Sequence, residues 1–194
     1  MAGKKRSGLA NDRRAYGCGR CYTPTPTPCG VINIASIATY DGESTYILNG
    51  NYTITECQIL NIQVGTILGI IEGQTLTNSG TINNSGTINN SGGTIQNNSG
   101  GTINNSGTID NSGYLYNNSG TIDNSGTIDN SGGTIATIGF IYTYGGGTIN
   151  NTGGTIFNTP GGTISTSNGG ACGAGTFTGT NINNTGTINT NCPP

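Results

Sequence analysis

Aliphatic residues recur at short and regular intervals through the middle of the chain, each within a Gly-Thr-Ile-Asn-Asn-Ser unit. Clear copies are SGTINNSGTINNSGG at 79–93 and SGTIDNSGTIDNSGG at 119–133. The recurring aliphatic positions, which we expect to form the core, are Leu76, Ile82, Ile88, Ile95, Ile103, Ile109, Leu115, Ile122, Ile128, Ile135, Ile141, Ile149, Ile156 and Ile164. Every third member is separated from the next by about twenty residues, as in Leu76, Ile95 and Leu115. The pattern therefore predicts three short strands per coil of a repeating structure.

Each Thr-Ile-Asn triplet is a minimal strand in which Ile points to one side and its neighbours to the other. The Asn-Ser-Gly that follows suits a corner, because Asn and Gly tolerate positive φ. We therefore predict an all-β, three-sided parallel β-helix (solenoid) with about 20 residues per coil, Ile stacked inside and Asn outside. On this prediction Ile122→Asp unfolds the stack, whereas Asn124→Asp is mild.

The chain divides into four expected segments. Residues 1–30 form a basic, Cys- and Pro-containing extended arm, in which the alternating Thr and Pro of 22–30 favour a stiff polyproline-type spacer. Residues 31–75 are β-rich coils that begin and cap the body, 76–164 are the regular repeats, and 165–194 form an irregular C-terminal cap. Within the repeats, 136–147 brings in Phe140, Tyr142 and Tyr144. We expect a loop or cap there that packs on the stack, with a docking surface as the alternative.

Composition and charge narrow the function. Only 7% of residues are charged, 36 are Gly, and His and Trp are absent, which excludes His-dependent catalytic triads and His-ligated zinc. All six basic residues lie in the first twenty positions: Lys4, Lys5, Arg6, Arg13, Arg14 and Arg20. The rest of the chain carries seven acids and no base. We expect the basic residues to anchor the protein to a partner, either an acidic protein lattice or the acidic body of another copy, with nucleic acid less favoured. No enzyme activity, cofactor, secretory signal or membrane span is expected.

The six cysteines and the repeat acids leave alternatives open. The disulfide candidates are Cys18, Cys21, Cys29, Cys57, Cys172 and Cys192, with Cys172 and Cys192 placed to clip the C-terminal segment. Zinc bound by Cys18, Cys21, Cys29 and Cys57 is a less favoured alternative, because the spacing matches no standard pair of knuckles, and free thiols are a third. Asp110, Asp123 and Asp129 occupy the same slot of the repeat, which predicts one exposed acidic row.

The repeats and the preceding VGTILGIIEGQTLTNSGTINN (64–84) resemble those of right-handed parallel β-helix surface proteins, including bacterial autotransporter and filamentous-haemagglutinin adhesins and repeat proteins of large DNA viruses. The resemblance implies a right-handed solenoid and no active site. With the charge distribution, it favours a non-enzymatic structural protein of a large multi-copy assembly, such as a minor capsid or virion surface component. The alternative is an adhesin or extracellular filament subunit. Ice binding is less favoured, although it would suit the Thr columns (Thr81, Thr102, Thr121; Thr87, Thr108, Thr127, Thr148), because the motif is not Thr-x-Thr.

Overall fold

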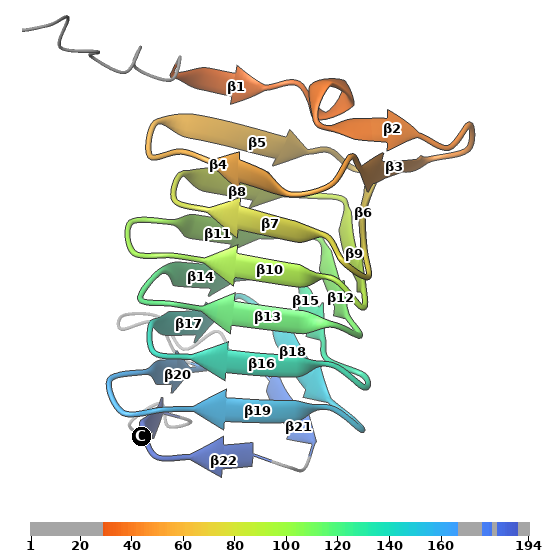
Figure 1. Cartoon of the computed structure of the whole chain (residues 1–194). Helices are drawn as coiled ribbons and strands as arrows, with labels where there is room; N and C mark the ends of the chain where they lie inside the picture. Colours follow the sequence, from red (N-terminus) through yellow and green to blue (C-terminus); the bar gives the residue numbers. More distant parts are fainter. Residues whose placement is uncertain (1–28, 167–175, 180–181, 190–194) are drawn as a thin grey trace, which may run out of the picture.

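A computed structural model describes residues 29–166, 176–179 and 182–189, which form one stack of short strands (Figure 1). The strands belong to three sheets, and every pairing is parallel except that of β2 with β3. The described residues contain a single helical turn, η1 (Ile34–Ser36). The predicted all-β, three-sided parallel solenoid is confirmed.

The three sheets run side by side along the stack. In pairing order sheet A contains β1 (Gly30–Ile32), β5 (Gln58–Ile62), β8 (Thr81–Asn84), β11 (Thr102–Asn105), β14 (Thr121–Asn124), β17 (Phe140–Thr143), β20 (Thr163–Ser165) and β23 (Thr187–Asn189). Sheet B contains β2 (Ala38–Tyr40), β3 (Thr45–Leu48), β6 (Ile67–Ile71), β9 (Thr87–Ser91), β12 (Thr108–Asn111), β15 (Thr127–Asp129), β18 (Thr148–Asn151) and β21 (Thr176–Gly179). Sheet C contains β4 (Tyr52–Ile54), β7 (Thr75–Asn78), β10 (Thr94–Asn97), β13 (Tyr114–Asn117), β16 (Thr134–Thr137), β19 (Thr155–Asn158) and β22 (Ile182–Asn184). From β4 onward the chain visits sheets C, A and B in turn, so three strands make one coil.

The aliphatic columns lie inside the stack in the expected register. In sheet C, Leu76 pairs with Ile95 and Ile95 with Leu115, steps of 19 and 20 residues. All fourteen predicted core positions, Leu76 through Ile164, are at most 1% exposed. The coil length of about twenty residues and the inward aliphatic columns are therefore confirmed.

A second inward column, made of asparagine, lies beside each aliphatic column. Strands such as β8 are four residues long and alternate half-buried and buried, so Ile82 and Asn84 both face inward while Asn83 faces outward. Asn84, Asn105 and Asn124 are each at most 1% exposed. The expectation that the repeat Asn residues all stack outside is wrong for the second Asn of each unit. Asn124→Asp is therefore not a mild change, because it places a carboxyl group in the interior.

The inward asparagines form directional amide ladders between coils. In sheet A the Asn84 Nδ2 donates to the Asn105 Oδ1 at 2.7 Å, and the Asn105 Nδ2 donates to the Asn124 Oδ1 at 2.7 Å. Sheet B repeats this pattern from Asn90 through Asn111 to Asn130. Each amide also donates to a backbone carbonyl of the next coil, as the Asn105 Nδ2 does to the Thr127 oxygen at 3.0 Å. The ladders satisfy buried polar groups that would otherwise destabilise the fold.

The amide ladders begin on an apolar coil. Ile62 and Ile70 lie directly before Asn84 and Asn90 in the register, and both are at most 1% exposed. The first rungs donate forward, so nothing donates back to them, and the Oδ1 atoms of Asn84 and Asn90 have no hydrogen-bond partner. In sheets A and B the inward amide ladders therefore start against aliphatic side chains.

Glycine at the corners lets successive coils approach closely. A Cβ built on Gly126 would lie 2.1 Å from the backbone oxygen of Gly107, the corresponding corner of the previous coil. At Gly132 the reason is different, since φ is +88° and the space around it is open. The corners therefore need glycine for close contact in some places and for backbone conformation in others.

The N-terminal end of sheet B is covered by an antiparallel hairpin of β2 and β3. The Asp41 carboxylate in its turn accepts hydrogen bonds from the backbone N–H groups of Glu43 and Thr45, which lower the pKa of Asp41. The sheet therefore ends here in β2, an antiparallel strand of three residues.

Residues 136–147 continue the regular solenoid. They contain the end of β16 and the whole of β17, and Ile141 takes its place in the sheet A aliphatic column beside Ile122. The expected loop or cap is therefore wrong, because Phe140 and Tyr142 occupy the two outward positions of an ordinary strand.

Candidate functional site

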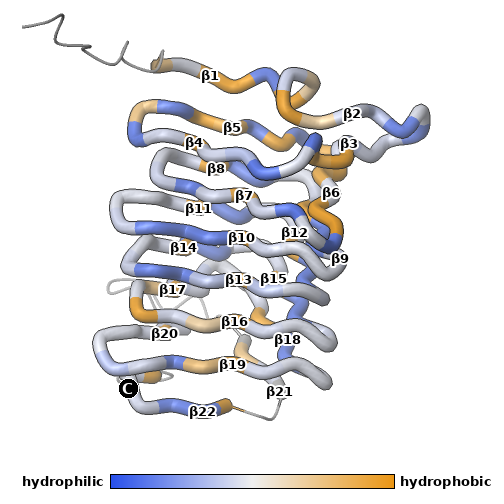
Figure 2. The backbone as a smooth tube through the Cα atoms, viewed as in Figure 1, coloured by the Kyte–Doolittle hydropathy of each residue, from blue (hydrophilic) through white to orange (hydrophobic). Residues whose placement is uncertain are grey.

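Large apolar side chains gather on one part of the outer surface. We call this group the aromatic band: Tyr114, Tyr116, Ile138, Phe140, Tyr142 and Phe157. Tyr114, Ile138, Phe140 and Phe157 are 39–47% exposed. The band crosses from sheet C, over the corner at Ile138, to sheet A, and in Figure 2 the corner that joins β16 to β17 is hydrophobic. At most outward positions of the same columns the neighbouring strands carry Thr, Asn, Gln or Asp, with Ala136 between Tyr116 and Phe157.

Within the aromatic band the rings form parallel pairs. The Tyr114 and Tyr116 ring centroids are 5.6 Å apart with 16° between the planes, and those of Phe140 and Tyr142 are 5.7 Å apart at 7°. Tyr116 and Phe157 lie on either side of Ala136 in the register of sheet C. These stacked pairs are partly exposed, a surface suited to planar or ring-shaped apolar groups.

Sequence reasoning found only part of this group. It singled out Phe140, Tyr142 and Tyr144 but missed Tyr114, Tyr116 and Phe157. The signal was present, because Tyr-Leu-Tyr-Asn replaces Thr-Ile-Asn-Asn at 114–117 and strict alternation points both tyrosines outward.

Acidic side chains lie on two faces of the solenoid, and one of them, Asp123, lies beside the aromatic band. Asp123 of β14 is in register with Tyr142 of the band on sheet A, whereas Asp110 and Asp129 pair with each other on sheet B. The expected single acidic row is therefore wrong, because the same repeat slot falls on a different sheet in each third of the coil. The Asp129 Oδ1 accepts hydrogen bonds from the Asn150 Nδ2 at 3.3 Å and from the Ser131 hydroxyl. Partial burial raises the pKa of Asp123.

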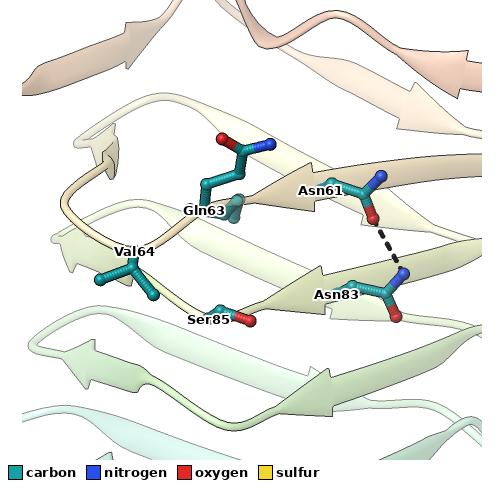
Figure 3. Close-up of a pocket in the computed structure, with 6 residues that line it drawn as sticks. Asn61, Gln63, Val64, Asn83 and Ser85 are labelled. Carbon is teal, nitrogen blue, oxygen red and sulfur yellow. Dashed lines mark hydrogen bonds between the residues drawn. The ribbon is translucent and has the colours of Figure 1, made fainter.

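Asp123 follows an outer amide ladder on sheet A. The Asn104 Nδ2 donates to the Asn83 Oδ1, and the Asn83 Nδ2 donates to the Asn61 Oδ1, each at 2.9 Å. Figure 3 shows the Asn83–Asn61 bond at a shallow depression whose rim also carries Gln63 and Val64. The depression is lined by amides, one hydroxyl and aliphatic carbon, with no titratable group among its lining residues. Its chemistry suits weak polar contact.

The structure pairs two of the six cysteines. Cys29 and Cys57 form a disulfide with an S–S distance of 2.09 Å and Cα atoms 4.9 Å apart. The bond ties the beginning of β1 to the turn between β4 and β5. These two sulfur atoms are therefore not free zinc ligands, which removes half of the proposed zinc set. Cys18, Cys21, Cys172 and Cys192 lie outside the described residues.

The predicted anchoring residues Lys4, Lys5, Arg6, Arg13, Arg14 and Arg20 also lie outside the described residues. All seven acids of the body lie inside them, at Asp41, Glu43, Glu56, Glu72, Asp110, Asp123 and Asp129. Within the described ranges no cluster of three Cys, Asp or Glu side chains could hold a metal ion. No helix among these residues is long and apolar enough to cross a membrane.

Comparisons with family models, with curated proteins and with solved structures find no match for this chain. The solenoid and its repeat are therefore established by the structure alone.

Proposed function

We propose that the protein is a non-enzymatic structural subunit of a large multi-copy assembly, and more specifically a minor capsid or virion surface component anchored by residues 1–30. The observation that carries the proposal is the separation of charge. Every base lies at positions 4–20, and every acid but Asp12 lies in the solenoid. Like-charged bodies repel each other, so a basic arm that lies against a neighbouring body offsets that repulsion.

The solenoid supplies a suitable building block. Successive coils are joined by parallel backbone pairing and, in the middle of the stack, also by the inward amide ladders, for example between β11 and β14. Such a stack has a defined length and flat outward faces. A subunit of this kind contributes shape and spacing, a role that requires no active site.

The test compares the full chain with a variant in which the six arm bases are replaced by Gln. We expect the full chain to form oligomers in sedimentation velocity at about 50 mM salt that dissociate at about 500 mM, because salt screens exposed charges. The neutral-arm variant should stay monomeric. A control with the four Arg residues replaced by Lys keeps the charge and should still associate. Non-reducing gels confirm that the oligomers are not disulfide-linked.

A full chain that is monomeric at low salt, or that associates equally well with a neutral arm, contradicts the proposal. A variant that lacks residues 1–28 gives a second measurement of association without the arm. It keeps Cys29 and therefore the Cys29–Cys57 disulfide. Binding of host cells or glycans by the protein without its arm would instead support an adhesin.

A further inference from the structure

We propose that the aromatic band is the docking site for the Tyr-Thr-Pro-Thr-Pro-Thr-Pro segment, residues 22–28, of a second copy of this chain. The inference deepens the proposed function, because it names where the arm of one copy lies on the next. Tyr114, Ile138, Phe140 and Phe157 of the band are each more than a third exposed although the surrounding outward positions are polar. A cluster of this kind on an otherwise polar surface marks an interaction site.

The chemistry of residues 22–28 matches that of the aromatic band. Alternating proline favours the extended polyproline II conformation, which presents proline rings on its surface and loses little entropy when it binds. Aromatic surfaces are the general partners of such segments, because proline rings pack against flat ring faces. The pairs Tyr114–Tyr116 and Phe140–Tyr142 supply those faces on adjoining sheets.

Charge supports the same occupant. Asp123 is in register with Tyr142 of the band, and Asp110 and Asp129 lie on sheet B. The arm continues from Tyr22 directly into its basic part, with Arg20, Arg14 and Arg13 nearest. A segment seated on the band therefore brings these bases to a body whose charged residues are all acids.

The reach of the arm indicates that the occupant is another copy. The Cys29–Cys57 disulfide holds the start of β1 at one end of the stack. The strand of the band nearest that end is β13, which lies in the same coil as β14. In sheet A, β14 is four strands away from β1, which at the usual spacing is about 19 Å. Pro24 is five residues before Cys29, and five residues of polyproline II span about 16 Å. Pro26 and Pro28 reach less far, so the three prolines cannot lie on the aromatic band of their own chain.

The test uses the full chain and a fluorescent peptide of residues 1–28 with Ser in place of Cys18 and Cys21. The band variant is Tyr116→Gln, Phe140→Thr and Tyr142→Asn, which copies Gln96, Thr121 and Asn104 from the same outward columns. Because these residues already occur in the fold, the variant should keep the circular dichroism spectrum of the parent. A matched control, Val64→Thr with Ile71→Thr, removes exposed apolar groups that lie outside the band.

We expect the band variant to weaken binding of the peptide by about tenfold or more in fluorescence anisotropy, and the control variant to leave it unchanged. Replacing Pro24, Pro26 and Pro28 of the peptide by Ser should weaken binding to a similar extent with all charges kept. Equal binding by the band variant, or by the Ser peptide, overturns the inference. If oligomers then still respond to neutral arm bases, the proposed function stands and only the docking site is wrong.

A cross-link separates binding between copies from binding within one. A photoreactive phenylalanine in place of Thr25 is introduced into the full chain, and isotopically light and heavy copies are mixed before irradiation. Cross-links to the aromatic band that join light to heavy chains support the inference. Cross-links confined to single chains overturn it.

Discussion

Asn105→Asp tests the inward amide ladders most directly. The Asn105 Nδ2 donates to the Asn124 Oδ1 at 2.7 Å, to the Thr127 carbonyl at 3.0 Å and, more weakly, to the Gly107 carbonyl at 3.3 Å, while the Asn105 Oδ1 accepts from Asn84. Replacing the nitrogen by oxygen turns all three donations into contacts between acceptors at a site that is 1% exposed. The lost hydrogen bonds and a buried carboxyl group should lower the free energy of unfolding by about 3–5 kcal/mol at pH 7.

The loss should depend on pH. Burial raises the pKa of the introduced carboxyl group in the folded state above its unfolded value, so the folded state holds its proton more tightly. Stability is then best preserved below the unfolded pKa, at about pH 3 to 4, and falls as the pH rises through the folded value. Chemical denaturation followed by far-ultraviolet circular dichroism measures the free energy of unfolding of the variant relative to the parent chain. It is carried out at about pH 3 to 4 and again at pH 7.

The matched control is Asn104→Asp, one position away and facing outward. This change removes the exposed hydrogen bond from Asn104 to Asn83 and places a second carboxylate next to Asp123. We therefore expect the free energy of unfolding to fall by about 1 kcal/mol or less. Equal losses for the inward and outward variants would refute the inward amide ladders.

Three further changes probe the corners, the disulfide and the outer acid. Gly126→Ala should destabilise the fold by about 2 kcal/mol or more, because its Cβ would meet the Gly107 oxygen. Gly132→Ala adds only backbone strain, which costs about 1 kcal/mol. Thermal melts that rank the two variants in the opposite order contradict the close corner contact. Replacing both Cys29 and Cys57 by Ser should cost about 2–4 kcal/mol, and reductant should then no longer lower the stability of the variant through this bond. Asp123→Asn should stabilise the protein modestly at pH 7 but not near pH 3. The reason is that partial burial raises the pKa of Asp123, so ionisation of this carboxyl group lowers the stability of the fold. A gain in stability that is the same at both pH values argues against this cause.

The aliphatic columns could be predicted from the sequence because the spacing of the aliphatic residues alone determines the number of residues per coil. Leu76, Ile95 and Leu115 repeat at 19 and 20 residues, and that period is the register of sheet C. The inward asparagines could not be predicted from a three-residue strand. The strands have four residues, so residues i and i+2 share a face, and Asn84 lies inside with Ile82. Polarity suggested the surface for Asn84, but hydrogen bonds to Asn105 and to the Thr108 carbonyl in the next coil make burial of its amide nitrogen favourable.

The aromatic band and the Cys29–Cys57 disulfide depend on the fold more than on local pattern. Tyr116 and Phe157 are 41 positions apart in the sequence and come within two strands of each other only once the coil length is known. The six cysteines allow many pairings, and only the meeting of β1 with β5 brings Cys29 beside Cys57. Both features required the number of residues per coil as well as the residue types.

The forward-donating amide ladders make the coils interchangeable. In the middle coils, Asn97 and its equivalents Asn105 and Asn111 each receive one bond from the coil before and pass one to the coil after, so one such coil can replace another with the same ladder partners. A duplication or deletion of one unit of about twenty codons would preserve this chain of bonds and move the end of the stack by about 4.8 Å. The protein is in this respect a molecular ruler, whose length evolution can adjust in whole coils while both ends keep their own chemistry.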